Sequence, residues 1–176
     1  MKRGNSFGQV WIETVIYTLI ALVMIGLVLA FARPKIMEIQ DQATIKQSVE
    51  MLKQIDSTFL SMGSAGNQRI LEMSIQKGSL KIDGETDKFI FEMESRNLYS
   101  EPDVEITDGS VKILTQKLAD YNLVTLTLDY DDVYNIKISG KDELKTLTPA
   151  STSYTLTILN EGEDSSGNSI MNITVG

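Results

Sequence analysis

The sequence contains no cysteine and no histidine among its 176 residues. Without cysteine there is no disulfide framework and no thiol nucleophile, and without histidine the usual zinc sites and histidine-based catalysis are excluded. A glycine-rich phosphate loop, a nucleophile elbow and a recognisable pair of catalytic carboxylates are also missing. We therefore expect a protein that is not an enzyme and that uses no cofactor.

Positive charge is scarce: 16 lysines and arginines stand against 24 aspartates and glutamates, for a net charge of −8. This balance argues against nucleic acid as a partner. Three acidic segments could suggest a metal site. The first, Asp83–Asp87, spaces its carboxylates like the start of a calcium loop but lacks the loop's glycine and late glutamate, and the other two are acidic turns. We expect solvated hairpin tips and no metal at these segments, which are Asp83–Asp87, Asp129–Asp132 and Glu161–Asp164.

A long apolar run, Val10–Ala32, lies near the start of the chain and contains one carboxylate, Glu13. Its uncharged part, residues 14–32, would span about 28 Å as a helix, which matches the hydrocarbon core of a bilayer. Arg33-Pro34-Lys35 follows directly, with no small-residue cleavage site before it. These features favour a retained transmembrane helix over a secretory signal peptide. Glu13 then needs a partner or access to the headgroups, because an ionised carboxylate in hydrocarbon is costly.

Helical periodicity continues beyond Pro34 to about Met62, where the segment Gly63–Gly66 ends it. The apolar residues of this part fall into two groups that lie roughly 170° apart, taking about 100° per residue. Either the two faces have different partners, the second being the chain's own globular domain, or a kink at Pro34 rotates one part against the other. The first group is Ile36, Ile39 and Ala43, and the second is Ile45, Val49, Leu52, Ile55, Phe59 and Met62.

From Arg69 onward the pattern alternates with a period of two residues, and turn dipeptides separate the alternating runs. Short strands joined by tight turns predict antiparallel pairing. The expected fold class is therefore α+β, with a long N-terminal helix packed on an antiparallel sheet or β-sandwich head domain. The expected strands are Ile70–Ile75, Ser79–Ile82, Lys88–Glu94, Val104–Thr107, Ser110–Thr115, Leu123–Leu128, Tyr134–Ser139, Ser153–Leu159 and Ser169–Val175.

The first residues, MKRGNSFGQVWIE, combine a short basic leader, a glycine and Gln-x-x-x-Glu at the opening of the apolar helix. This combination resembles the class III signal of archaeal type IV pilin-like proteins. The resemblance implies that a prepilin peptidase cuts after Gly8, so that Gln9 becomes the N-terminus and Glu13 the fifth mature residue. In bacterial relatives, a glutamate at that position pairs with the terminal amine of a neighbouring subunit.

One feature departs from the family pattern. The residue before the cleavage-site glycine is usually basic, and here it is Phe7. A cut between Gly4 and Asn5 fits that local pattern better, but it would place Glu13 at the ninth mature position. Both sites therefore stay open, and we prefer the site after Gly8.

The resemblance also implies a domain organisation and a function. A leader (1–8) would precede a transmembrane and filament-core helix (9–33, here called the stem), an amphipathic continuation (34–62) and an extracellular β-rich head domain (67–176). The precursor would be inserted in the cell membrane, in contact with lipid and the prepilin peptidase. It would then join identical subunits in an extracellular filament. An archaellin is the near alternative, and a single-span anchor carrying a surface binding module is the alternative from another class.

A single glycosylation sequon is present, Asn172-Ile173-Thr174. Because the expected head domain is extracellular, Asn172 is a candidate for modification.

Processing gives the first testable prediction. We expect the native protein to begin at Gln9, or at Asn5 if the earlier glycine is used. N-terminal sequencing of protein taken from isolated surface filaments would measure this directly. An intact Met1 would contradict the resemblance to prepilins.

Overall fold

The computed structural model describes the backbone of residues 6–176 and the side chains of residues 11–176. The alternative cleavage site at Gly4 and Asn5 lies outside the described residues. The chain divides into two compact units, Met1–Ile39 and Gln40–Gly176, and the second is called the head unit below. The expected boundaries of the leader, the stem and the head domain remain predictions.

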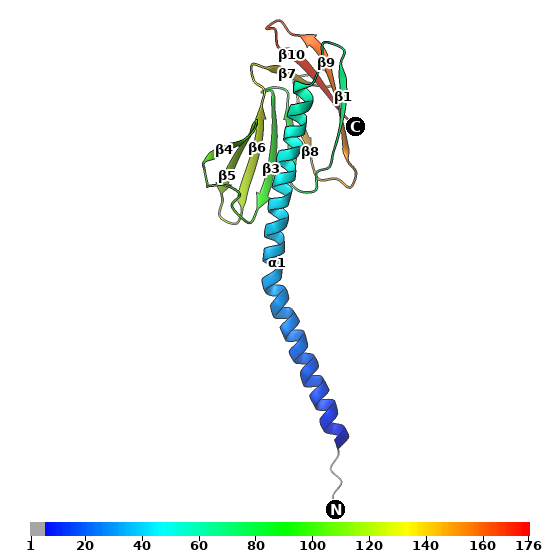
Figure 1. Cartoon of the computed structure of the whole chain (residues 1–176), viewed down its shortest axis with the longest axis vertical. Coiled ribbons are helices and arrows are strands. Elements are labelled where there is room, and N and C mark those ends of the chain that lie inside the picture. Colours follow the sequence, from blue (N-terminus) through cyan, green and yellow to red (C-terminus); the bar gives the residue numbers. More distant parts are fainter. Residues whose placement is uncertain (1–5) are drawn as a thin grey trace, which may run out of the picture. The chain divides into compact units, whose positions relative to one another are not determined.

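One helix, α1, runs from Ser6 to Leu60 and contributes to both units (Figure 1). Pro34 lies inside it. The helix ends two residues before the expected limit, and the amide of Met62 bonds to the carbonyl oxygen of Phe59 in a final tight turn. Gly66, with φ of 87°, then redirects the chain into the first strand, a backbone conformation that glycine adopts without strain.

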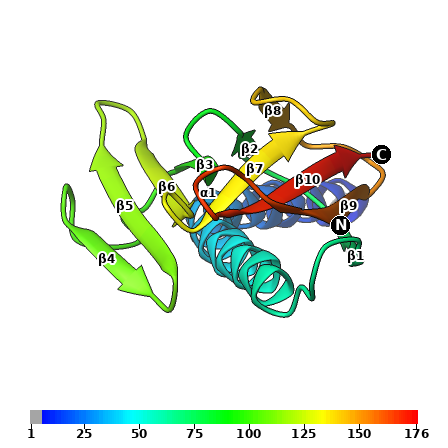
Figure 2. The same cartoon turned by 90° about the horizontal axis from the view of Figure 1, so that it is seen from above.

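All strands of the described chain belong to the head unit, and they form two sheets (Figure 2). One sheet has the strand order β1-β9-β10-β7, and the other has the order β4-β5-β6-β3-β2-β8. The strands are β1 (Gln68–Met73), β2 (Ser79–Asp83), β3 (Lys88–Ser95), β4 (Glu105–Asp108), β5 (Val111–Lys117), β6 (Asn122–Asp129), β7 (Tyr134–Ile138), β8 (Leu144–Leu147), β9 (Tyr154–Glu163) and β10 (Ser169–Val175).

The α+β class and the antiparallel character of most pairings are confirmed, and two details differ from expectation. Strand β10 pairs with β7 in parallel, because the chain leaves β7, adds β8 to the other sheet and returns through β9 before β10 begins. Strand β8 was not expected. Only Leu147 of its four residues is buried, so the strand shows no alternation in the sequence.

The hydrophobic core of the head unit lies between one face of α1 and the two sheets. Figure 2 shows strands of both sheets along one side of the helix. Ile45, Val49, Leu52, Ile55 and Phe59 are buried there, as the second apolar group of the sequence predicts. The opposite side of this helical segment is polar and exposed.

An aromatic cluster forms around the end of the buried helix face. The ring of Phe59 stacks on Tyr130 at 4.9 Å between centroids and meets Phe89 and Tyr134 edge to face at 5.7 and 5.4 Å. These three partners come from β3, from β7 and from the segment between β6 and β7. Phe59 therefore joins α1 to elements of both sheets.

The packing of Phe59 gives a prediction on stability. Phe59→Ala should lower the free energy of unfolding by about 3–5 kcal/mol, because it leaves a cavity in a filled aromatic cluster. Chemical denaturation of the full chain in detergent, followed by near-ultraviolet circular dichroism, would measure the change. Leu60→Ala is the matched control: Leu60 is the next residue and is 71% exposed, so its loss should change stability by less than about 0.5 kcal/mol.

Candidate assembly surfaces

The stem presents apolar side chains to its surroundings in every direction. By length and composition, α1 is a helix that can span a membrane, with a mean hydropathy of 2.7 over its most apolar window. No residue of that window is buried. The exposed large apolar side chains are Trp11, Ile12, Val15, Ile16, Tyr17, Leu19, Ile20, Leu22, Val23, Met24, Ile25, Leu27, Val28, Leu29 and Phe31.

Glu13 lies exposed among these apolar side chains and has no ion-pair or hydrogen-bond partner within the described residues. The polar group of Thr18 is different, since its hydroxyl donates to the carbonyl oxygen of Thr14 at 2.7 Å and is satisfied by the helix itself. A carboxylate cannot be satisfied in this way, because it carries a charge and only accepts hydrogen bonds. Glu13 is therefore the one acidic group of the described stem that needs an external partner.

The expected processing site lies in the first turns of α1. The backbone of Gly8, Gln9 and Val10 is helical, while their side chains lie outside the described residues. The cleavage site and the assembly role of Gln9 remain predictions, as does the role of Ala32 at the end of the apolar run.

A buried ion pair marks the start of α1 in the head unit. Asp41 is 5% exposed, and its carboxylate accepts from the Lys77 ammonium at 2.5 Å and from the backbone amide of Arg96 at 3.1 Å. It thus joins α1 to the β1–β2 connection and to the end of β3. The sequence does contain a signal for this role, because Asp41 precedes Ile45 by four residues and so lies on the buried helix face.

A second set of polar contacts lies closer to the C-terminal end of α1. The Lys53 ammonium lies 2.8 Å from the carboxylate of Asp108, the last residue of β4. Asp56 accepts hydrogen bonds from the hydroxyls of Ser110 at 2.7 Å and Tyr130 at 2.9 Å. Burial, and then the hydrogen bond to the Asp56 carboxylate, raise the pKa of the Tyr130 phenol. Together these contacts fix α1 to the β4–β5 hairpin and to the aromatic cluster.

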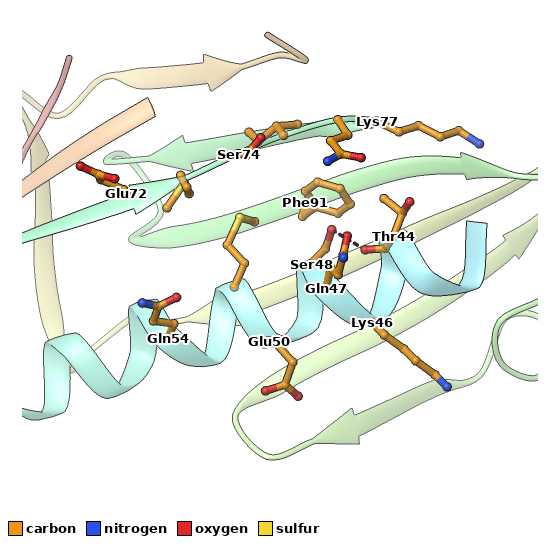
Figure 3. A pocket seen from close by; sticks show the side chains of 14 residues that line it. Thr44, Lys46, Gln47, Ser48, Glu50, Gln54, Glu72, Ser74, Lys77 and Phe91 are labelled. Atoms are coloured by element: carbon orange, nitrogen blue, oxygen red, sulfur yellow. Dashed lines mark hydrogen bonds between the residues drawn. The ribbon is translucent and has the colours of Figure 1, made fainter. Parts of the chain in front are cut away.

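A groove of about 520 Å³ lies between α1 and the segment that contains β1 and the residues after it (Figure 3). Its inner surface is apolar, with Met51, Met73, Ile75 and Phe91, while Glu72 and other polar side chains line its rim. Figure 3 shows Phe91 between the helix and the strands. The groove can receive an apolar side chain.

The acidic turns use their carboxylates to hold the backbone. Asp83 accepts from the amides of Glu85 and Thr86, and Asp87 accepts from the amide of Ile136. A hydrogen bond from the Asn135 side chain, followed by bonds from turn amides, holds the pKa of Asp164 below its usual range. Among the residues that the structure describes, no three acidic side chains converge as metal ligands would.

The sequon residue Asn172 lies on the outward face of β10, the strand between β9 and β7. Its side-chain amide donates to Glu161 at 2.6 Å, and its oxygen accepts from the amide of Gly140 at 2.9 Å. Glycosylation of Asn172 would leave one N–H on this nitrogen in place of two. Modification remains a prediction.

Comparison with known proteins adds no relative: no protein-family model, no curated protein and no solved structure matches this chain.

The hydrogen bond between Tyr130 and Asp56 predicts a loss of stability in alkali. Tyrosine in an unfolded chain ionises near pH 10, whereas native Tyr130 keeps its proton to higher pH. Above that pH the unfolded state binds fewer protons than the native state, so stability falls as the pH rises. Tyr130→Phe should make this fall less steep by up to about 1.4 kcal/mol per pH unit.

Urea unfolding of the full chain between pH 8 and pH 11.5 would measure the two slopes. Tyr121→Phe, in the exposed β5–β6 turn, is the matched control and should keep the slope of the unmodified protein. Equal slopes for Tyr130→Phe and the unmodified protein would show that Tyr130 ionises in the native state.

Proposed function

We propose that the chain is the structural subunit of an archaeal type IV pilus-like surface filament. The observation that carries the proposal is the stem, a membrane-length helix whose apolar side chains are exposed all round and surround a single carboxylate, Glu13. The leader residues before it, which resemble a class III signal, support the same function.

In this proposal the stem has two successive environments. It first spans the membrane, where lipid covers its apolar side chains and the prepilin peptidase removes the leader. Subunits then pack stem against stem, and the apolar surface passes from lipid into the core of the polymer. Lipid and neighbouring stems are similarly apolar, so close packing and polar pairing must favour assembly.

Glu13 supplies the polar pairing. After cleavage the new terminal ammonium lies one helical turn before Glu13, and a neighbouring subunit shifted along the filament axis brings its own ammonium to this carboxylate. In an apolar bundle the two charges neutralise each other, whereas either charge alone would be costly. The pairing thus favours a defined shift between subunits.

The head unit would be the exposed part of the filament. We assign it as a pilin-like head of β-sandwich type, located outside the cell, with surface properties such as adhesion set by its outer strands. The two sheets that share a core with one face of α1 support this assignment. The proposal gives the head no catalytic role.

Two other functions share the same stem. An archaellin, the subunit of a swimming filament, would use it identically, and loss of motility on deletion of the gene would favour that function. A single-span anchor with a binding module would use the stem only for attachment. The groove beside α1 is the observation that favours the anchored binding module. Electron microscopy of shed surface material separates them, because an anchored monomer gives no filaments.

The role of Glu13 gives the test of the proposal. Glu13→Ala should leave membrane insertion intact and strongly reduce filament mass, because it leaves a buried ammonium unpaired at about 3–5 kcal/mol per subunit. Filament yield by sedimentation and imaging, with insertion by membrane fractionation, would measure both effects. The processed N-terminus should be determined for each variant, so that failed cleavage is not mistaken for failed assembly.

Thr18→Ala is the matched control. Its hydroxyl bonds only within the helix, so this variant should assemble normally. Normal filaments from Glu13→Ala would show that the pairing role is wrong.

A further inference from the structure

Strand β4 leaves part of a sheet uncovered. It is an edge strand, paired only with β5, and all four of its residues are exposed. Ile106 lies directly opposite the buried Ile113 and so shares the face of the sheet that packs toward α1. Yet Ile106 is 40% exposed, and Val104, two residues earlier, is 42% exposed. An apolar strip therefore continues past the region that α1 covers.

The same edge of the sheet carries carboxylates. Asp103 and Glu105 alternate with Val104 and Ile106 along the chain and so point to the other face of this edge. They and Glu101 are exposed, and none of the three forms an ion pair within the described chain, although Asp129 and, more weakly, Glu105 raise the pKa of the Lys112 ammonium. The wider surface has the same sign, because residues 40–176 contain 12 lysines and arginines against 22 aspartates and glutamates, a net charge of −10. A partner for the strip would thus combine apolar side chains with positive charge.

Residues 33–39 of α1 have that combination. Ile36 and Ile39 are 52% and 66% exposed and lie on one face of the helix, one turn apart. At about 100° per residue, Arg33 lies beside this face on one flank and Lys35 on the other. Arg33 has no ion-pair partner among the described residues, and Lys35 is paired only with Glu38, at the surface. This apolar face with basic flanks is complementary to an apolar strip at an acidic sheet edge.

We propose that β4 of one subunit docks on residues 33–39 of a second copy of the chain. This inference rests on the proposed filament function and deepens it, since it names what covers the first apolar group of the helix. The contact joins two different surfaces, so each subunit can use its β4 on one neighbour and its residues 33–39 on another. Such a heterologous contact gives an open helical assembly when its rotation does not close, which is the case that the proposed filament requires.

The complete absence of cysteine makes cross-linking a clean test. One cysteine would replace Val104 or Ile106, and a second would replace Ile36 or Ile39, giving four double variants. Assembled filaments would be oxidised and separated on a non-reducing gel. We expect at least one pairing to give a ladder of dimers, trimers and longer species that dithiothreitol collapses to monomer, because cysteines bridge only at a Cα separation below about 7 Å.

Lys145→Cys in β8, combined with Ile39→Cys, is the control and should remain monomeric on the gel. If all four pairings assemble into normal filaments and none gives a ladder, the proposed contact is wrong while the filament function stands. If the unmodified protein forms no filaments in its native setting, the filament function itself fails. The two failures are therefore distinguishable.

A charge-reversal experiment tests the same contact independently. Glu105→Lys should lower the assembled fraction several-fold at low salt, and adding Lys35→Glu should restore it, since the pair is reversed and not lost. Glu85→Lys makes the same charge change in the β2–β3 turn and should have no effect. A double variant that assembles no better than Glu105→Lys alone would overturn the charge pairing.

Discussion

The packing of one face of α1 into the core of the head unit is the constraint on which the rest of the structure depends. Leu52, Ile55 and Phe59 bring strands of both sheets onto a single helix, so the sheets share one core instead of two. This choice of face also decides which side chains stay outside. Ile36 and Ile39 belong to the other apolar group and remain exposed, together with the apolar stem.

Polar anchors at both ends of the buried helix segment define how that face is held. Asp41 joins α1 to Lys77 and to the backbone at Arg96, and Asp56 joins it to Ser110 and Tyr130. Such buried or half-buried polar bonds add less to stability than apolar packing does, but they are costly to break, because each leaves an unpaired group behind. They favour one rotation of the helix in its core.

Charge is distributed unevenly along the chain, and this matters for the proposed assembly. The head unit is acidic, whereas α1 carries exposed basic side chains at Arg33, the last residue of the stem, and at Lys35, just after it. Like-charged heads repel one another at low salt, so contacts between heads alone would not hold a polymer together. In the proposed assembly, apolar stems with a paired Glu13, and an acidic strand edge docked on a basic helix segment, would offset that repulsion.

The sequence by itself determined the local elements. Periodicity predicts the length of the apolar run, the two apolar groups of α1 and most strands of the head. This works because burial of one face makes apolar residues recur at the period of the helix or strand. Only the tertiary structure decided the parallel pairing of β7 with β10, the short strand β8, the partners of Asp41 and the uncovered face of β4. Each of these depends on which segments, distant in the sequence, contact one another in the fold. Hydrophobic periodicity and composition are local properties and do not specify such contacts.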